Sequence, residues 1–421
     1  MVFSDREGKV YVHPFLRMVV QEGTRLRLPL KEELIPLPQG CRLFFLPGRR
    51  PLGFNPGSSS FEVLSLFEGR GVWAVGAFLI PAYLRLHLPA TFWEDRNILL
   101  PLWAYTAVGF YGGRFFVSAV RVDRRQRQWP RYYKGISLRK NIEKLLKRYP
   151  QNRLLRHFAN CAYNYRCLAA TNLFLHRWEA PLVVSNRCNA SCWGCLSYQK
   201  DLFIPSHQRI SFRPHIEEVA EVALEHILSA SEPIVSFGQG CEGEPLMESK
   251  LVVRTLKFVR RRTLRGTIHL NTNASIPAAV DELGAAGLSS LRISLNSARE
   301  EFYNLYFRPR GYKFSDVIRS LKVAKKRGVF VSLNLLLFPG FNDTRGEVEA
   351  LVRLVKKYKV DMVQMRNLSI DSEFFSQVVL KDFKEKPLGM LYLWQKLKAI
   401  KGLKLGYFNL PHSEFSHFQN L

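Results

Sequence analysis

Three of the chain's seven cysteines fall within nine residues, in the stretch RCNASCWGC from Arg187 to Cys195. Cys188, Cys192 and Cys195 have the spacing C-x-x-x-C-x-x-C. An odd cysteine count with a tight cluster favours a reducing compartment and metal ligation over a disulfide framework. Two cysteines would suggest a redox pair and four a closed metal site, so three thiolates imply a metal centre with one open position.

Zinc and iron–sulfur are the two metal centres to weigh for this cluster. Structural zinc needs four ligands, usually Cys₄ or Cys₃His, and neither His176 nor His207 stands at a usual ligand spacing. An iron–sulfur cluster fits better, because thiolates are its normal ligands and a short loop can hold three corners of a cubane. The fourth iron then takes its ligand from elsewhere. Zinc or a non-catalytic cluster is the alternative.

The cysteine spacing, placed directly after the predicted strand PLVVS (181–185), resembles the radical S-adenosylmethionine (radical SAM) superfamily. The resemblance implies that Cys188, Cys192 and Cys195 bind a [4Fe–4S] cluster and that SAM chelates the fourth iron. It implies an enzyme that reductively cleaves SAM to a 5′-deoxyadenosyl radical for hydrogen abstraction from a substrate. It also implies a low-potential electron donor of the flavodoxin or ferredoxin type. The residue before the last cysteine, often aromatic in this family, is glycine here.

A glycine-rich element, SFGQGCEGEPL (236–246), follows the next predicted strand. Its G-x-G-x-x-G pattern is also that of a dinucleotide-binding loop, but the region about 20 residues on, RRRTLRG, offers no acid for a ribose. The family resemblance instead implies the "GGEP" element that meets the ammonium of SAM. The residues matched are Gly243, Glu244 and Pro245, with Glu242 in place of the first glycine.

Polar residues at the ends of later predicted strands are the remaining candidates. The carboxyl ends of barrel strands collect binding residues, although a single polar strand end is often only a cap. The resemblance implies that some of them bind SAM. For Gln364 and Arg366 it implies a position facing the cluster, the SAM carboxylate or the substrate. The alternative is that these two residues only close the barrel edge through hydrogen bonds to loops. The cofactor-binding candidates are Asn271, Asn273, Ser294, Asn296, Asn334 and Arg366.

The cysteines outside the motif allow two interpretations. Cys161 and Cys167 stand just before the barrel and either hold a second cluster or are buried structural thiols. Cys241 either relays a hydrogen atom or carries a methyl group, which makes it the one candidate catalytic residue, or it is a small core residue. No cysteine follows Cys241, so the auxiliary-cluster domain of many peptide-modifying relatives is not expected.

The elements that position these residues are repeated β/α units from Ala180 onward. Short apolar runs alternate with amphipathic stretches such as 215–228 and 344–358, which predicts a parallel sheet covered by helices. Glu347 stands three residues after Thr344, so a capping box is expected there. We expect an α/β fold with a partial (β/α)₆ barrel. The predicted strands are 181–185, 233–238, 267–273, 291–296, 330–338 and 361–367.

The chain is expected to divide into four parts. Residues 1–120 are β-branched and aromatic segments broken by proline and glycine, and predict a β-rich domain. Residues 121–178 form a basic helical connector, 179–375 the radical SAM core and 376–421 a C-terminal extension. The resemblance covers roughly residues 180–370. It is to an uncharacterised branch similar to the molybdenum-cofactor and peptide-modifying types, carried by SLNSAREEFYNLYFRPRGY and VQMRNLSID.

The formal net charge of +27 favours an anionic partner such as RNA, unless it reflects a basic proteome or a hot habitat. The stretch 121–156 carries 13 Lys/Arg against two acids, with Trp129, Tyr132 and Tyr133 among them. It predicts a helical region with two possible roles. Either its basic residues contact the phosphates of RNA and its aromatic rings stack on the bases, or it is a solvated helix that packs against the barrel. The substrate is accordingly RNA, a peptide or a small molecule, and the non-enzymatic alternative is a metal-containing nucleic-acid-binding protein.

No membrane segment or secretory signal is predicted. The amino-terminal stretch MVFSDREGKV mixes charges with no apolar run, and the most apolar segment, 72–84, is interrupted by Pro81 and stopped by Arg85. A spanning helix needs about 20 apolar residues. The expectation is a soluble, cytoplasmic protein.

Overall fold

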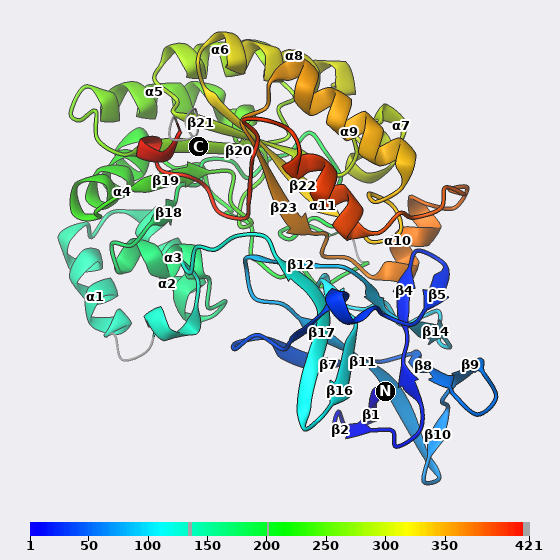
Figure 1. The fold of residues 1–421 in the computed structure, drawn as a ribbon. Helices are drawn as coiled ribbons and strands as arrows, with labels where there is room; N and C mark the ends of the chain where they lie inside the picture. The colour runs from blue at the N-terminus through cyan, green and yellow to red at the C-terminus, as the bar shows by residue number, and fades with distance from the viewer. Residues whose placement is uncertain (134–136, 200–201, 416–421) are drawn as a thin grey trace.

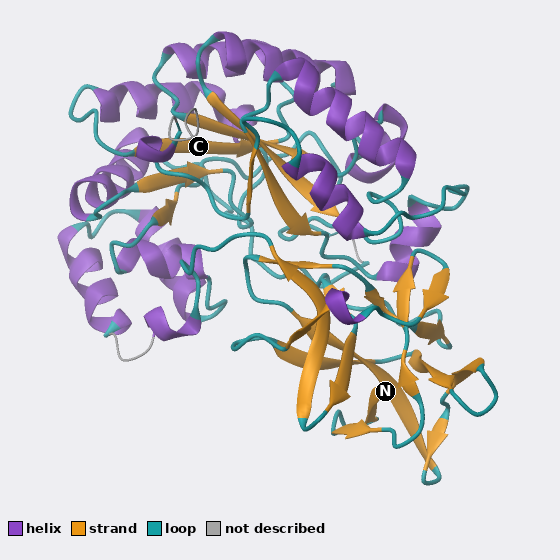
Figure 2. Cartoon of the chain, viewed as in Figure 1, coloured by secondary structure: helices purple, strands orange, loops and turns teal. Residues whose placement is uncertain are grey.

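The computed structural model describes residues 1–133, 137–199 and 202–415. It has a β-rich N-terminal part and a larger part built on one parallel sheet, joined by three short helices (Figures 1 and 2). The sheet is curled, and its helices cover the outer, convex face (Figure 2). This arrangement confirms the predicted α/β partial barrel with a separate β-rich N-terminal region.

Seven parallel strands form the sheet, and they stand in chain order. Each crossover therefore returns the chain to the adjacent position, as in a β/α barrel that has not closed. The strands are β18 (Glu179–Pro181), β19 (Ile234–Phe237), β20 (Thr267–Thr272), β21 (Ser290–Leu295), β22 (Phe330–Leu337), β23 (Met362–Asn367) and β24 (Lys404–Gly406).

The six predicted strands are present, with two differences. The first is shorter and earlier than the predicted 181–185, because only 179–181 pair as a strand with β19. The following residues stay buried and continue the pairing irregularly, since Leu182 N donates to Ser236 O at 2.8 Å. The seventh strand, β24, was not predicted, because its three residues Lys404–Gly406 give no apolar run to detect.

In the described residues eight helices follow the strands, and most of them cover the outer face of the sheet, whereas α10 lies beside the N-terminal part (Figure 1). In α4 the residues at helical spacing, Val219, Val222 and Ile227, are fully buried, which confirms the pattern. The helices are α4 (Ile216–Ser229), α5 (Ser249–Arg260), α6 (Pro277–Ala285), α7 (Glu300–Phe307), α8 (Phe314–Lys326), α9 (Arg345–Tyr358), α10 (Ser372–Val378) and α11 (Met390–Lys398).

The capping box expected before α9 does not form. Thr344 is the N-cap residue by position, but its hydroxyl donates to Phe341 O at 3.0 Å. Glu347 instead accepts a 3.0 Å hydrogen bond from the hydroxyl of Ser297. The carboxylate is drawn to the loop after β21, so it ties two successive β/α units together.

The helical connector is shorter than predicted. Helices α1 (Leu138–Arg148), α2 (Arg153–Tyr163) and α3 (Leu168–Phe174) precede the sheet, whereas residues 122–129 are irregular and 134–136 lie outside the described residues. The apolar stripe is correct, since Ile142 and Leu145 are buried against the barrel core. The helix prediction was wrong for residues 121–129, because Arg121 ends β17 and 122–129 are irregular, whereas 130–133 form a 3₁₀ helix.

Antiparallel strands in four small sheets make up the N-terminal part. Segment 72–84 lies mostly in β11, and no described helix is long and apolar enough to cross a membrane. The strands are β1 (Val2–Asp5), β2 (Val10–Val12), β3 (Arg17–Met18), β4 (Val20–Glu22), β5 (Arg25–Arg27), β6 (Leu34–Pro36), β7 (Arg42–Leu46), β8 (Arg49–Asn55), β9 (Ser60–Val63), β10 (Leu66–Phe67), β11 (Arg70–Phe78), β12 (Tyr83–Arg85), β13 (Leu88–Pro89), β14 (Thr91–Trp93), β15 (Tyr105–Thr106), β16 (Val108–Tyr111) and β17 (Arg114–Arg121).

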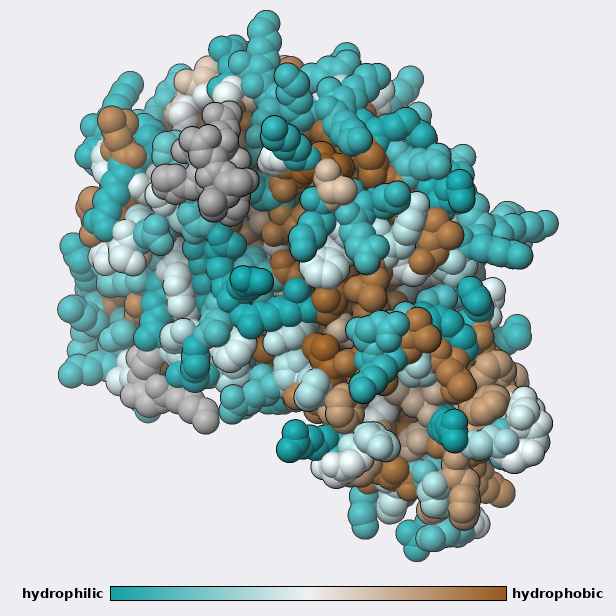
Figure 3. All heavy atoms as spheres, in the orientation of Figure 1, coloured by the Kyte–Doolittle hydropathy of each residue, from teal (hydrophilic) through white to brown (hydrophobic). Residues whose placement is uncertain are grey.

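Four short 3₁₀ helices complete the described structure: η1 (Lys31–Glu33), η2 (Pro130–Tyr133), η3 (Pro245–Glu248) and η4 (His412–Glu414). The N-terminal part shows more apolar surface than the outer helices (Figure 3). Phe15 and Tyr111, for example, are 76% and 80% exposed. Apolar surface of this kind often marks a contact face.

Candidate functional site

The three motif cysteines lie in the long loop between β18 and α4. All three are partly buried and free of disulfides. Burial raises the pKa of Cys188 to about 11, and the nearby Glu244 carboxylate adds to this shift. Burial also raises the pKa of Cys192 well above its usual value, helped by the other two thiols. Thiolates therefore form here together with a bound cation rather than before it.

The positions of the motif thiols fit a multi-iron cluster better than a single ion. In the described part of the chain, the one set of three metal-binding side chains whose ligand atoms all lie within 4.8 Å of one another is elsewhere, at His157, Cys161 and Cys241. Thiolates on one tetrahedral zinc are about 3.8 Å apart, from a Zn–S bond of about 2.3 Å. The three motif thiols do not all lie within 4.8 Å of one another, so they are spread more widely than the thiolates of one zinc ion.

The cysteine loop is held against the end of α7 by backbone hydrogen bonds. Ser191 N donates to Phe307 O at 3.0 Å, and Arg310 N donates to Asn189 O at 2.8 Å. Residues 190 and 309 form a β-bridge between these two bonds. The segment SAREEFYNLYFRPRGY therefore supports the loop that carries the thiols.

The residue before the last motif cysteine, often aromatic in the radical SAM family, is Gly194 here, and the reason is steric. A Cβ on Gly194 would lie 2.6 Å from the hydroxyl of Tyr306, which is buried beneath the loop. Trp193, one place earlier, points to the opposite side, where its indole donates to Leu305 O at 3.1 Å and stacks 3.7 Å from the Arg308 guanidinium. Tyr306 thus occupies the space that an aromatic side chain at position 194 would need.

The glycine-rich element after β19 pairs with the cysteine loop. Gly243 N donates to Ser185 O at 2.7 Å, and Glu244 N donates to Arg187 O at 2.8 Å. A Cβ on Gly243 would lie 2.0 Å from Arg187 O, so no other residue fits this approach. The close contact of the two loops accounts for the glycine at this position.

Glu242, which replaces the first glycine of the family's element, joins the same two loops. Its buried carboxylate accepts hydrogen bonds from the amides of Val184 and Ser185 on one side and of Gly238 and Gln239 on the other. Burial raises the pKa of Glu242 to about 7, although these four bonds oppose the shift. The carboxylate is a cross-link in the loop framework, so the departure from the family pattern has a structural role.

Glu244 stands at the start of η3, with Pro245 at the first helical position. Its carboxylate accepts from Leu246 N at 3.0 Å, from Asn273 N at 2.8 Å and from the hydroxyl of Thr272. Burial raises the pKa of Glu244 to about 7. A carboxylate accepts about four hydrogen bonds, so one position remains for a donor such as an ammonium.

Asn273 and Asn271 hold the framework from β20. The amide of Asn273 donates to Asn189 Oδ1 at 2.8 Å, which fixes the residue directly after the first motif cysteine. Asn271 donates to Phe237 O at 2.8 Å and pairs with His269 at 2.9 Å. Asn273 lies beside the cysteine loop, Asn271 bonds to residues of the barrel strands, and both side chains are occupied by protein partners.

The candidates on β21 and β22 differ in what surrounds them. Ser294 and Asn334 are direct neighbours in the strand register and are only partly buried. Asn296 is fully buried and donates to Phe302 O at 3.0 Å, so it supports the start of α7. Of these three, Ser294 and Asn334 have side chains open to a ligand.

Arg366 lies on the inner face of the barrel near a second arginine. Its guanidinium stacks 3.8 Å from the ring of Tyr407 and donates to Gln364 Oε1 at 3.2 Å. Arg292 on β21 donates to the same oxygen at 2.6 Å. Burial, together with the Arg366 charge, lowers the pKa of Arg292 to about 9. Two guanidinium groups converge on one neutral amide, which leaves positive charge inside the barrel.

Glu179, His269, Arg292 and Asn409 are members of the polar barrel interior that the sequence analysis missed. Glu179 accepts from Ser236 at 2.5 Å and from Asn409 at 2.7 Å, and Asn409 also accepts from Gln364 at 2.7 Å. Burial lowers the pKa of His269 to about 4. Polar residues at every second position of TIHLNTN and LRISLN were the available signal, since alternate residues share one face of a strand.

The N-terminal part packs against the ends of β22 and β23, beside this interior. Arg85 N donates to Asn367 Oδ1 at 2.9 Å, and the Arg85 guanidinium donates to Leu368 O at 2.9 Å. Gly23 N donates to Pro339 O at 3.2 Å in the loop after β22. The N-terminal strands therefore border the open end of the barrel.

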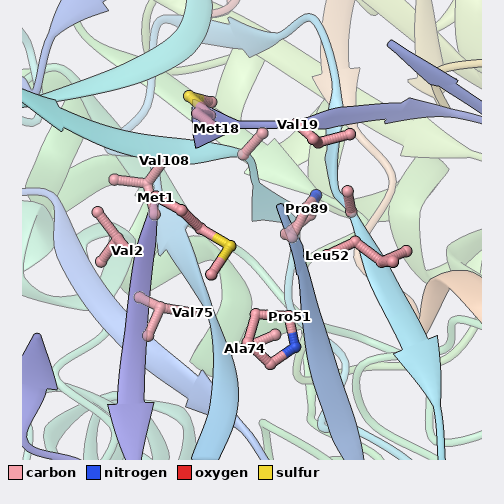
Figure 4. A pocket seen from close by; sticks show the side chains of 12 residues that line it. Met1, Val2, Met18, Val19, Pro51, Leu52, Ala74, Val75, Pro89 and Val108 are labelled. Carbon is pink, nitrogen blue, oxygen red and sulfur yellow. The ribbon is translucent and has the colours of Figure 1, made fainter. Parts of the chain in front are cut away.

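A small cavity inside the N-terminal part is separate from this site. It has a volume of about 20 Å³, enough for roughly one water molecule. Its walls are apolar side chains from several strands (Figure 4). We regard it as a packing gap between small sheets. Its lining includes Met1, Met18, Pro51, Ala74, Pro89 and Val108.

Residues 182–363 match the family model described as the Radical SAM superfamily. The matched region starts at the end of β18 and includes the cysteine loop, the glycine-rich element and β19 to β22. This match, over 182 of the chain's 421 residues, supports membership of the radical SAM superfamily. Enzymes of this superfamily use a [4Fe–4S] cluster and S-adenosylmethionine.

Curated relatives match part of the chain at low identity. A GTP 3′,8-cyclase from Marinobacter nauticus is 26% identical over 182 residues, 43% of this chain and 51% of the relative. One from Petrotoga mobilis is 31% identical over 173 residues, 41% of this chain and 50% of the relative. The chain spans about half the length of these relatives.

Solved structures resemble the chain only weakly. The hydrogenase maturase HydG from Carboxydothermus hydrogenoformans has a TM-score of 0.37 at 12% identity, covering 62% of this chain and 65% of that one. Streptococcus suis SuiB has a TM-score of 0.36 at 13% identity, covering 66% and 61%. Scores this low carry no conclusion about the reaction.

Proposed function

We propose that the protein is a radical SAM enzyme in which Cys188, Cys192 and Cys195 ligate three irons of a [4Fe–4S] cluster. When bound and reduced, the cluster supplies the electron that cleaves SAM to methionine and a 5′-deoxyadenosyl radical. The observation that carries the proposal is the pairing of the cysteine loop with the glycine-rich element through Gly243 and Glu244. It brings three thiols and one buried carboxylate to the same end of the barrel.

The chain's own groups would bind and orient SAM. Glu244 has one free acceptor position for the ammonium group of SAM, beside Gly243 and Pro245 in the same element. Ser294 and Asn334 offer partly exposed polar atoms at adjacent register positions. Asn271, Asn273 and Asn296 would act indirectly, by fixing the loops, because their side chains already bond to protein groups.

The charge inside the barrel supports an anionic substrate, with Arg366 and Arg292 as its binding groups. Their shared partner Gln364 is neutral, and the Nε atoms of both guanidiniums are buried without a hydrogen-bond partner. Charge-assisted bonds to a phosphate or carboxylate would satisfy them.

A small anionic molecule fits this interior better than RNA, while the basic face of α1 leaves RNA as the second substrate class. The matching regions of GTP 3′,8-cyclases agree with a phosphate-bearing substrate. The electron would come from a flavodoxin- or ferredoxin-type donor.

The test is SAM cleavage by the whole protein. The chain is reconstituted anaerobically with iron and sulfide, reduced with dithionite and given SAM, and 5′-deoxyadenosine is measured. We expect formation that is lost in Cys192→Ala and kept in Cys41→Ala, whose thiol lies in the N-terminal part. A reducible cluster that neither changes its spectrum with SAM nor cleaves it would contradict the proposal. That result would favour a non-catalytic metal protein that binds nucleic acid.

A further inference from the structure

Three potential metal ligands converge away from the cysteine motif, between α2 and the glycine-rich element. They are His157 and Cys161 on α2 and Cys241 after β19, and their ligand atoms all lie within 4.8 Å of one another. Residues four apart on a helix share one face, so α2 presents its imidazole and thiol together. The three ligands come from two segments about 80 residues apart in sequence, which local chain geometry alone would not bring together.

The spacing of these atoms suits one tetrahedral ion. Cys161 Sγ lies 3.6 Å from His157 Nε2. In a tetrahedral zinc site with Zn–S of about 2.3 Å and Zn–N of about 2.0–2.1 Å, the sulfur–nitrogen edge is about 3.6 Å. Neither Cys161 nor Cys241 forms a disulfide.

The surroundings are those of a closed, structural site. Cys161 and Cys241 are 1% and 5% exposed, and His157 is partly buried. His207, from the loop after the cysteine motif, lies close enough to Cys161 for their charges to interact. His207 is therefore a candidate for the fourth ligand. Two thiolates and one or two imidazoles, closed off from water, are the ligand set of structural zinc.

We propose that His157, Cys161 and Cys241 bind a structural Zn²⁺ ion, with His207 completing the tetrahedron. The ion would join the helical connector to the glycine-rich element. Cys241 directly precedes Glu242, which cross-links the loops after β18 and β19. The second metal therefore braces the framework beside the cysteine motif. This proposal does not depend on the proposed radical SAM activity.

The experiment separates the two metal sites by substitution. A protein with Cys188, Cys192 and Cys195 all changed to alanine is purified anaerobically and its zinc content measured. We expect about one zinc per chain. In this background the added change Cys161→Ser or Cys241→Ser should remove the zinc, whereas Cys41→Ser should keep it. Zinc that persists in both serine variants, or is absent from the background protein, overturns the proposal.

Cobalt provides a readout that needs no substitution at the new site. The triple-alanine protein is stripped of metal and titrated with Co²⁺ alone. A thiolate-to-cobalt charge-transfer band and tetrahedral d–d bands that saturate at one equivalent are expected. A spectrum without thiolate bands would overturn the site even if the serine variants fail to fold. Neither result bears on SAM cleavage, so the two proposals fail independently.

Discussion

Arg49 of β8 and Asp371, the N-cap residue of α10, form an ion pair 2.7 Å long in which both side chains are completely buried. The pair crosses between the N-terminal strands and the barrel. Asp371 also accepts from Leu100 N at 2.7 Å, so its carboxylate is bonded from both parts of the molecule. A buried charge of this kind depends on its partner, since desolvation costs several kcal/mol per ion.

Arg49→Met should therefore destabilise the protein strongly. We expect the free energy of unfolding to fall by about 3–5 kcal/mol, because the Asp371 carboxylate is left buried without its counter-ion. Urea unfolding measures the change. The matched control is Arg139→Met on α1, which removes an exposed pair with Glu143 and should cost about 1 kcal/mol or less. Equal effects of the two substitutions would show that the buried pair does not hold the parts together.

Gly243→Ala should prevent stable cluster binding. Its new Cβ would meet Arg187 O at 2.0 Å and push the glycine-rich element away from the cysteine loop. We expect the iron content after reconstitution to fall several-fold while the circular dichroism spectrum stays close to that of the unmodified protein. Gly240→Ala is the control in the same element, because its Cβ would find no atom closer than 3.8 Å. Full iron binding by the Gly243→Ala protein would argue against the pairing of these loops as the basis of the site.

The sheet could be predicted from the sequence, and the supports of the site could not. Strands β19 to β23 are short segments with apolar residues in runs or at alternate positions, between amphipathic helices, so the pattern found each within a residue or two. β24 is only three residues long and was not predicted, and residues 122–129 have the composition of a basic helix but are irregular. The spacing of apolar residues therefore predicted the elements whose structure is decided by burial alone.

Prediction of the site residues from local sequence spacing has the same limit. Cys188, Cys192 and Cys195 are consecutive in one loop, so spacing exposed them, whereas Tyr306, Arg308 and the β-bridge at Pro309 act on that loop from more than 100 residues away. Such long-range contacts leave no local spacing signal. Asn271 shows that a polar strand end does not by itself indicate a free side chain, since its amide is bonded to the neighbouring strand and to His269.

Asn273→Ala and Ser294→Ala should separate support of the loop from SAM binding. Asn273 bonds to Asn189 in the cysteine loop, so its loss should lower iron content. Ser294 is partly buried at the open face of β21, so its loss should leave iron unchanged and raise the SAM concentration for half-maximal 5′-deoxyadenosine formation about 5- to 10-fold, as expected for one hydrogen bond. Iron analysis and SAM titration of both variants decide this. A Ser294→Ala protein with unchanged SAM dependence would remove Ser294 from the SAM site.

Asp343 should make stability depend on pH. Burial raises its pKa to about 7 from 3.8, and its Oδ2 is buried without a hydrogen-bond partner. The folded protein therefore binds this proton more tightly than the unfolded chain, so stability falls as pH rises from about 4 to about 7.

Asp343→Asn keeps the acceptor for Gly340 N and removes the titration. We expect its melting temperature to match that of the unmodified protein at pH 4.5 and to exceed it at pH 8, each pKa unit contributing about 1.4 kcal/mol. The exposed Glu349→Gln substitution should show a constant difference over the same range. A difference for Asp343→Asn that also stays constant with pH would mean that Asp343 is ionised in the folded protein at all these pH values.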